Sequence, residues 1–431
     1  MNIAFDSSQF DITLDCAAAL DAADPLRSFR SEFDIPTDEA GTTKIYLVGN
    51  SLGALPVRSR AYVEAELDRW GRYGVEGHFT GDLAWEPYHE LLTEPMGAIV
   101  GGQANEVVVM NALTVNLHLL MVSFYRPTAR RHKVMIEDHA FPSDHFAVES
   151  QIRQRGFDPS DSLIRLSPRE GSETLEPADI LEEIRAAGDE LAMIMLPGVQ
   201  YYTGQLLPME EIAEAGHVVG ARVGFDLAHA AGNVPLHLHD WGVDFAAWCT
   251  YKYLNGGPGG VGGAFVHERH VNDQSLPKLL GWWGSRKDTR FEMGTTFEPI
   301  PTVESWQVSN APILSMAALR GGLEIVAEAG GMEVLRAKSE LQISYLDFLL
   351  ARELGGKINS ITPDDLSQRG AQFALTITDP SVEGRGVYER LEEAGVACDW
   401  RYPNVIRVAP VPLYNSFDDI YRFVQIMKGL V

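Results

Sequence analysis

The stretch WCTYKYLNGGPGGVGG, residues 248–263, places one lysine between two tyrosines, directly before a run rich in glycine. The residues at 245–250 are mainly aromatic, small and apolar, and this composition predicts a short buried strand. Residues 255–263 contain six glycines and one proline, so they cannot continue a regular element, and their backbone can approach another group closely. The sequence therefore predicts a strand that leads into a glycine-rich shelf carrying Lys252.

Lys252 allows two interpretations. It is either a solvated side chain beside a turn or a reactive amine. Aromatic neighbours would remove water from the amine and lower its pKa, and a neutral amine can form a Schiff base with an aldehyde. Pyridoxal phosphate is held to proteins in this way, so the choice depends on what the rest of the chain supplies.

The composition is that of an ordinary globular protein. The chain has 431 residues, of which 45% are hydrophobic and 22% are charged, which is enough for two domains. Its 35 basic and 60 acidic side chains give a net charge of −25, which disfavours binding to nucleic acids or anionic membranes. No secretory signal or membrane-spanning run is recognisable, and Cys16, Cys249 and Cys398 fit reduced thiols. We expect a cytoplasmic protein that binds a small molecule.

Strands and helices alternate through much of the chain. We expect strands near residues 106–110, 133–137, 191–196, 221–225 and 245–250, and helices near 57–70 and 113–124. In the first helix, Val57, Tyr62, Leu67 and Trp70 are spaced for one face. This alternation predicts an α/β fold with a mainly parallel sheet covered by helices on both faces.

The C-terminal part has a different character. A long helix follows Pro312, and strands at 373–378 and 405–410 are mixed with further helices, as in a small α+β domain. We therefore divide the chain into an N-terminal segment that packs with the small domain (1–60), a large cofactor-binding domain (61–310) and the small domain itself (311–431).

Polar residues follow the expected strand ends, where parallel sheets bind their ligands. Asp226 lies 26 residues before Lys252, and its carboxylate could keep a pyridinium nitrogen protonated, although such an aspartate can equally cap a helix. His229 follows one turn later, either beside the same ring or as a core histidine. Leu113 and Thr114 begin a helix whose free N–H groups and dipole could receive a phosphate, and the alternative is a plain threonine cap.

Three further residues have two interpretations each. Phe141 could stack on a flat cofactor or belong to the core. Asp144 is a turn residue unless the cofactor is close. Ser51 lies in a glycine-containing turn, where it is either an exposed functional group or an ordinary turn residue.

Several phrases of this sequence, in this order, resemble kynureninases from about residue 44 to the end. They are GNSLGALP (49–56), MNALTVNLHLL (110–120), HAFPSDHFA (139–147), YYTGQ (201–205), FDLAHAAGN (225–233), YKYLNGGPGG (251–260) and RVAPVPLYNSF (407–417). The resemblance implies a pyridoxal-phosphate enzyme with the aspartate aminotransferase type of fold, similar to class-V aminotransferases. It also implies hydrolysis of L-kynurenine, and of 3-hydroxykynurenine, to anthranilate or 3-hydroxyanthranilate and L-alanine, in tryptophan catabolism and NAD biosynthesis.

The resemblance also implies roles for individual residues. Lys252 would hold the cofactor covalently, Asp226 would pair with its ring nitrogen, and Tyr251 would act as an acid or base. The residues that would contact the cofactor are Leu113, Thr114, Phe141, Asp144, Asp226, His229, Tyr251, Lys252, Trp282 and Asn310. Arg407 would bind the substrate α-carboxylate, with Ser51 and Asn310 also at the substrate. Some of these residues would act across a subunit interface, which implies a homodimer.

One stretch departs from the family pattern. Eukaryotic kynureninases carry a histidine that helps to receive 3-hydroxykynurenine, whereas this chain has Val75 at the matching position and His78 three residues later. The preference between the two substrates is therefore open.

Other histidines give weaker signals. His237 and His239 could suggest a metal pair, but no third ligand follows at metal-site spacing, and we expect no metal. His267 and His270 lack the order of a zinc-protease motif.

Two alternatives remain at this point. The first is another enzyme of the same fold, an aminotransferase or a cysteine desulfurase, although Cys398 lies in no desulfurase motif. The second is a non-catalytic scaffold, which would be expected to lack Lys252 or Asp226.

Overall fold

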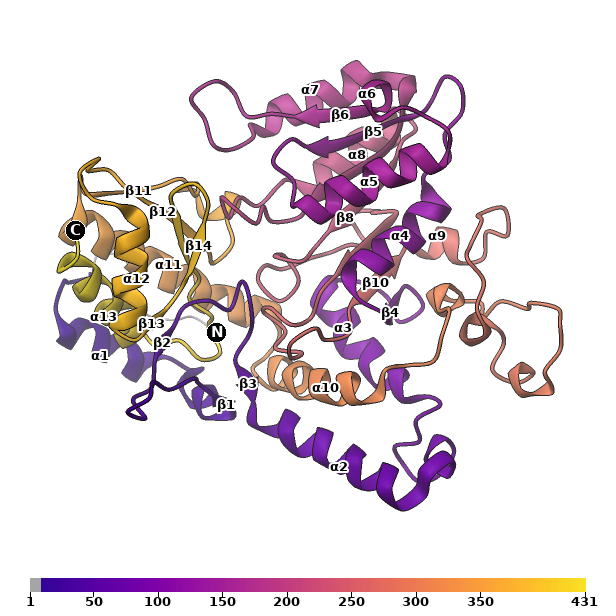
Figure 1. Ribbon diagram of the computed structural model, residues 1–431, viewed down its shortest axis with the longest axis horizontal. Helices are drawn as coiled ribbons and strands as arrows, with labels where there is room; N and C mark the ends of the chain where they lie inside the picture. The colour runs from indigo at the N-terminus through magenta and orange to yellow at the C-terminus, as the bar shows by residue number, and fades with distance from the viewer. Residues whose placement is uncertain (1–8) are drawn as a thin grey trace.

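The computed structural model describes residues 9–431, which form a large body around one sheet and a smaller body beside it (Figure 1). Within this described part, no helix combines the length and the apolar character needed to cross a bilayer.

The large body contains a seven-stranded sheet in the order β4-β10-β9-β8-β7-β5-β6. The strands are β4 (Val107–Val109), β5 (Lys133–Glu137), β6 (Leu163–Leu166), β7 (Leu191–Pro197), β8 (Arg222–Asp226), β9 (Phe245–Trp248) and β10 (Gly263–Val266). β10 runs opposite to the other six strands of this sheet, so its pairings with β4 and β9 are antiparallel and the remaining pairings are parallel. The predicted mainly parallel sheet is confirmed, whereas β6 and β10 were not predicted, because β6 carries an exposed arginine and β10 directly follows the glycine-rich shelf.

Helices cover both faces of this sheet, as predicted. On β9, the neighbouring residues Ala246 and Ala247 point into two different core clusters, because successive side chains of a strand face opposite sides. One cluster contains side chains of α3 (Thr93–Val100), α7 (Pro177–Ala187) and α8 (Met209–Val218). The other contains side chains of α4 (Leu113–Phe124) and α5 (Pro142–Gln154). Strands buried on both faces explain the nearly continuous apolar runs in the sequence.

Helix α2 (Val57–Tyr73) forms where the sequence predicts it, but most of its predicted apolar face is exposed in this chain. Leu67 is 45% exposed and Trp70 is 61% exposed, and Tyr62 is partly covered, donating a hydrogen bond to Glu324 of α10 (Ile313–Glu328). The expected helix is therefore confirmed, and its apolar stripe faces outward rather than into the core.

The smaller body contains a four-stranded antiparallel sheet in the order β11-β12-β15-β14. Its strands are β11 (Ile358–Ser360), β12 (Phe373–Ile377), β14 (Asp399–Arg401) and β15 (Val405–Val408), and its helices are α11 (Met332–Leu354), α12 (Gly384–Glu393) and α13 (Phe417–Lys428). This is the α+β arrangement expected for the C-terminal part of the chain.

The N-terminal segment packs with the smaller body. Helix α1 (Leu14–Ala23) lies against α13, and β2 (Ile45–Tyr46) pairs in parallel with β13 (Val396–Ala397). Helix α10 is counted with the small domain in the division at residue 311, but it packs against α2 and α3, and its Met316 and Leu319 belong to a core cluster of the large body. The segment between β2 and α2 therefore links the two bodies.

Candidate active site

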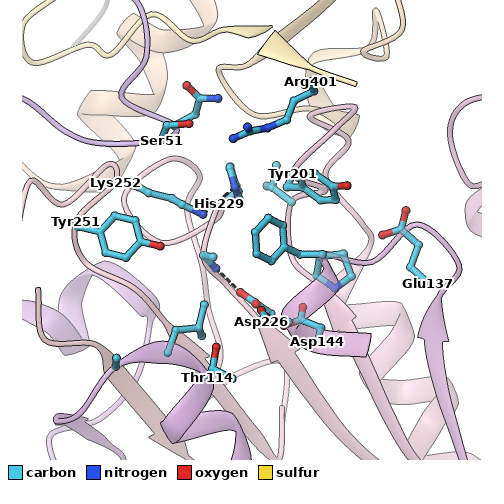
Figure 2. A pocket seen from close by; sticks show the side chains of 18 of the residues that line it. Ser51, Thr114, Glu137, Asp144, Tyr201, Asp226, His229, Tyr251, Lys252 and Arg401 are labelled. Atoms are coloured by element: carbon cyan, nitrogen blue, oxygen red, sulfur yellow. Dashed lines mark hydrogen bonds between the residues drawn. The ribbon is translucent and has the colours of Figure 1, made fainter. Parts of the chain in front are cut away.

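A cavity of about 440 Å³ lies at the carboxyl ends of the parallel strands, next to the smaller body (Figure 2). Residues predicted to act in one site line it together: Ser51, Leu113, Thr114, Phe141, Asp144, Asp226, His229, Tyr251, Lys252 and Arg407. Several of them directly follow strands or begin helices, which is where open parallel sheets bind their ligands.

Lys252 enters the cavity from the loop after β9. The shelf behind it turns sharply, since Asn255, Gly257 and Gly259 all have positive φ angles, of 56°, 84° and 63°. The lysine Nζ lies 2.8 Å from His229 Nε2. Burial removes water from around the amine and lowers the pKa of Lys252, which favours the nucleophilic neutral form.

The turn that carries Ser51 packs directly on this lysine loop. Gly53 donates its N–H to the carbonyl oxygen of Tyr251, and a Cβ at Gly53 would lie 2.3 Å from the carbonyl oxygen of Lys252. Only glycine fits such a close approach, which explains the GNSLG phrase and brings Ser51 to the edge of the cavity.

Two buried carboxylates meet at the floor of the cavity. Asp226 ends β8 and accepts a hydrogen bond from the N–H of Ala228 at 2.7 Å (Figure 2). Asp144, from the first turn of α5, lies beside it, and burial together with the charge of Asp226 raises the pKa of Asp144 well above its usual range. Because two neighbouring buried carboxylates repel each other, Asp144 is the member of the pair that favours its protonated form.

The first turn of α4 borders the same cavity. Its N-cap residue, Ala112, has no side-chain oxygen, so the side chain of this residue cannot bind the first N–H groups of the helix. Leu113, Thr114 and Val115 line the cavity, and Thr114 is drawn with its hydroxyl toward it (Figure 2). Free N–H groups, a hydroxyl and the positive end of the helix dipole are the donors that a phosphate needs.

An aromatic and an imidazole ring line the space between these groups. Phe141 is 48% exposed, and its ring lies edge-on to Tyr201 at 5.1 Å. His229 is buried, and desolvation and the nearby cations Lys252 and Arg407 lower its pKa well below the usual range. Its Nδ1 is buried with no hydrogen-bond partner among the described residues. The neutral imidazole and the exposed phenyl ring are suited to a flat heteroaromatic ring carrying polar substituents.

Arg407 lies on β15 at the opposite side of the cavity and is 1% exposed. Its Nε donates to Asp399 Oδ1 at 2.6 Å, its Nη2 donates to Asp399 Oδ2, and Nη2 also donates to Ser51 Oγ at 3.1 Å. Asp399 lies directly opposite Arg407 in the pairing of β14 with β15. This arrangement joins Ser51, Asp399 and Arg407 into one network.

Four residues in or next to the cavity were not predicted individually: Glu137, Tyr201, Asp399 and Arg401. Burial raises the pKa of Glu137, at the end of β5, to about 8. Tyr201 belongs to the YYTGQ phrase, and the resemblance of this phrase to the family could have identified it as a site residue. Asp399 and Arg401 are two residues apart on β14, so they point to the same face, but the sequence does not show which face that is.

Two predicted residues lie outside this cavity in the single chain. Trp282 is 46% exposed, and its Nε1 donates to the carbonyl oxygen of Arg290 at 3.0 Å. Asn310 is exposed in the loop before α10. Val75 and His78 also lie elsewhere, with Val75 76% exposed and His78 Nδ1 3.1 Å from the carbonyl oxygen of Val75. These positions are outside the cavity wall that this chain forms.

The histidines considered as possible metal ligands contact other side chains of the chain. His237 packs against Trp241, whereas His239 Nδ1 lies 2.9 Å from Glu106 Oε1 and its ring stacks on His267. The same Glu106 oxygen accepts the N–H of Glu268 at 2.7 Å. His270 lies 2.6 Å from Asp244. The expectation of no metal stays a prediction.

Known proteins resemble this chain over nearly its whole length. It is 53% identical to a kynureninase of Koribacter versatilis over 97% of this chain and 98% of the relative, and 52% identical to one of Myxococcus xanthus over 96% of each. This chain belongs to the kynureninase family. The family model of the kynureninase C-terminal domain matches residues 335–427, which cover most of the smaller body.

Solved structures with the same fold as this kynureninase-family chain include sulfur-handling enzymes. The cystine C-S lyase C-DES has a TM-score of 0.75 and 17% identity, covering 90% of this chain and 98% of that one. The cysteine desulfurase CsdA from Escherichia coli has a TM-score of 0.73 and 15% identity, covering 94% and 99%. Another C-DES structure carries glycine linked covalently to pyridoxal phosphate. The predicted fold, that of pyridoxal-phosphate enzymes related to class-V aminotransferases, is confirmed.

The desulfurase alternative receives no support from Cys398. This thiol is buried in the core of the smaller body, and burial raises its pKa far above the usual range. A desulfurase needs a mobile, ionisable thiol at the cofactor, and the residues lining the cavity of this kynureninase-family chain include no cysteine among those described.

Proposed function

We propose that the cavity around Lys252 is the active site of a kynureninase. The reaction is hydrolysis of the Cβ–Cγ bond of L-kynurenine, which gives anthranilate and L-alanine, and 3-hydroxykynurenine is the second expected substrate. The observation that carries this proposal is one cavity that combines a desolvated lysine, a buried carboxylate pair and an uncapped helix end, in a chain about half identical to kynureninases.

The cofactor is pyridoxal 5′-phosphate, and the residues present fit it. We assign the phosphate to the first turn of α4, the ring nitrogen to the Asp226 and Asp144 pair, and the ring face to Phe141. The unpartnered Nδ1 of His229 and its position beside Lys252 match a ring with polar substituents. When bound, this group supplies an electrophilic carbon and an electron-withdrawing pyridinium ring.

The side chains of the cavity have complementary proton-transfer roles. Lys252, whose pKa is lowered, can accept the Cα proton of the substrate at Nζ once its amine is free. A negative charge at Asp226 would keep a proton on the ring nitrogen of the bound cofactor. Burial and a neighbouring thiol raise the pKa of Tyr251, so its phenol stays protonated at neutral pH and can donate a proton to the departing carbon. Water adds to the γ-carbonyl before the Cβ–Cγ bond breaks, so the γ-carbon leaves as the carboxylate of anthranilate and Cβ receives the proton.

Product analysis tests this function directly. The purified protein loaded with pyridoxal phosphate is expected to show a visible absorption band from the lysine-bound cofactor. It should also convert L-kynurenine to equal amounts of anthranilate and alanine. A protein with the band that transaminates kynurenine or releases sulfide from cysteine would contradict the proposal. Absence of the band would favour the scaffold alternative.

We also propose a homodimer whose active sites draw on both subunits. Trp282 and Asn310 lie outside the cavity of their own chain, and Leu67 and Trp70 expose the apolar face of α2. Apolar area of this kind on a helix is usually buried by another element. A second copy of the chain would cover it and bring the missing cofactor and substrate contacts. A cytoplasmic location, proposed for the same enzyme, agrees with its three unpaired cysteines.

Mixed dimers test the composite site. Lys252→Ala and Trp282→Ala chains are each expected to be nearly inactive alone. After subunit exchange, a mixed dimer has one cavity with an intact Lys252 and an intact Trp282 from the other chain, so part of the activity should return. The control is exchange of Lys252→Ala with itself. Full exchange, verified by tagged chains, without recovered activity would mean that both residues serve the same cavity from one chain.

A further inference from the structure

Arg401 is a second guanidinium at the cavity, in addition to that of Arg407. It ends β14 of the smaller body, and its side chain reaches into the cavity above His229 and beside Tyr201 (Figure 2). Thr114 lies at the opposite end of the cavity, with Lys252 between the two (Figure 2). A ligand bonded near Lys252 therefore has the phosphate-binding helix on one side and Arg401 on the other.

Most of the N–H groups of Arg407 already have close acceptors within the chain. Its Nε and Nη2 bind the Asp399 carboxylate, and Nη2 also binds Ser51. Its Nη1 donates to the carbonyl oxygen of Tyr201 at 2.5 Å and to Gln372 Oε1 at 3.5 Å. A guanidinium has five N–H groups, and four of those of Arg407 have a close acceptor here, whereas the fifth has only the 3.5 Å contact with Gln372. Arg407 therefore offers a substrate one weakly bound N–H unless it gives up one of its close partners.

Arg401, in contrast, has few close hydrogen-bond acceptors. Its Nη2 lies 3.4 Å from Asp399 Oδ2, and its Nη1 lies 3.5 Å from the carbonyl oxygen of Trp400, both at the weak end of hydrogen-bond distances. Its Nε is buried and has no partner among the described residues. A buried N–H group without an acceptor costs free energy, so the Nε of Arg401 is suited to bind an acceptor supplied by a ligand.

The net charge at this end of the cavity also favours binding of an anion. Two guanidinium groups, Arg401 and Arg407, share the single carboxylate of Asp399, which leaves one positive charge. Burial and the neighbouring Arg407 lower the pKa of Arg401, as expected for a desolvated cation without a full counter-charge. The same two arginines contribute to the low pKa of His229. One carboxylate would balance this excess.

We propose that Arg401 binds the α-carboxylate of the amino-acid substrate directly, through its Nε and one Nη group. Arg407 adds the Nη2 edge that it now shares with Ser51, and Asp399 holds the two guanidinium planes at a fixed spacing. The planar fork of Arg401 matches the two oxygens of a carboxylate. This inference rests on the proposed function, because it takes the substrate to be an amino acid bound near Lys252.

Binding of L-alanine and L-alaninamide tests this role without relying on turnover. Each is titrated into the cofactor-loaded protein while the visible spectrum is followed. The two differ only in the carboxylate, so a direct contact changes their affinities unequally. In Arg401→Gln, we expect the Kd of L-alanine to rise about 10- to 100-fold and that of L-alaninamide to change less than about threefold. Arg401→Lys should recover part of the loss, because a point charge cannot form the fork.

Arg385→Gln is the matched control, since Arg385 is an exposed arginine of the smaller body that lies over the rings of Tyr388 and Trp400 outside the cavity. It should leave both Kd values unchanged. An alanine affinity within threefold of the wild type in Arg401→Gln, or an equal loss for both ligands, would overturn the proposal. A wild-type protein that binds L-alanine yet leaves kynurenine intact would contradict the proposed function and not this contact.

Discussion

Replacing Lys252 with alanine is expected to abolish kynurenine cleavage, by more than about 10⁴-fold in kcat, and to remove the visible band of the bound cofactor. The variant loses both the covalent attachment and the amine positioned to accept the Cα proton, and losses of catalytic bases and nucleophiles are of this order. The fold should remain, because the side chain lies in a cavity and supports no core cluster. Borohydride reduction of the wild type, followed by peptide mass analysis, should locate the cofactor on Lys252.

Lys278 provides the matched control for this experiment. It is another desolvated lysine of the large body, and burial lowers its pKa to about 8, but it lies over the Trp306 ring away from the cavity. If desolvation alone were sufficient, the reduced adduct would also appear on Lys278. Lys278→Ala should keep both the visible band and the turnover. An adduct on Lys278, or substantial turnover in Lys252→Ala, would refute the assignment.

Replacing Arg407 with alanine is expected to lower kcat/KM for L-kynurenine about 30- to 1,000-fold, the equivalent of roughly 2 to 4 kcal/mol. The change removes a charge-assisted donor at the carboxylate end of the cavity and also leaves Asp399 with only the longer contact to Arg401 and the Ser51 hydroxyl. Breaking a buried ion pair on one side typically costs about 3 to 5 kcal/mol, so the free energy of unfolding should fall as well. Arg407→Lys should recover only part of either effect.

The control substitution Arg369→Ala separates the loss of kcat/KM from the loss of stability. Its side chain is fully buried and pairs with Asp347 at 3.1 Å, in the smaller body but outside the cavity. Arg369→Ala should therefore reduce stability while kcat/KM of the folded fraction stays near the wild-type value. The measurements are steady-state kinetics and urea unfolding, together with the cofactor spectrum, which should be unchanged in Arg407→Ala. A loss of less than about threefold in kcat/KM, or a loss of bound cofactor, would mean that Arg407 does not serve the substrate carboxylate.

The sequence predicted those features that depend on local composition. The shelf after β9 follows from its glycines, and the strands β5, β7, β8 and β9 follow from short apolar runs, so Lys252 and Asp226 could be placed at strand ends before any coordinates were known. The turn proposed to bind the phosphate was predictable for the same reason, because strand β4 is followed closely by helix α4.

Features that depend on distant parts of the chain could not be predicted. Asp399 reaches Arg407 only because β14 and β15 pair in one particular register, and a shift by one residue would turn both Asp399 and Arg401 away. The periodicity of α2 correctly predicted a helix, but periodicity does not tell what covers Leu67 and Trp70. Trp282 was placed at the site by resemblance to the family, and its own chain does not bring it there.

The two bodies contribute different chemistry to one cavity. The large body supplies Lys252, Asp226 and Thr114, whereas both guanidinium groups, Arg401 and Arg407, come from the smaller body. The residues proposed for the reaction and those proposed for the α-carboxylate are thus encoded in separate stretches of the chain. A substitution confined to the smaller body can therefore alter the contacts made by the guanidinium groups while the contacts of Lys252 and Asp226 stay as they are.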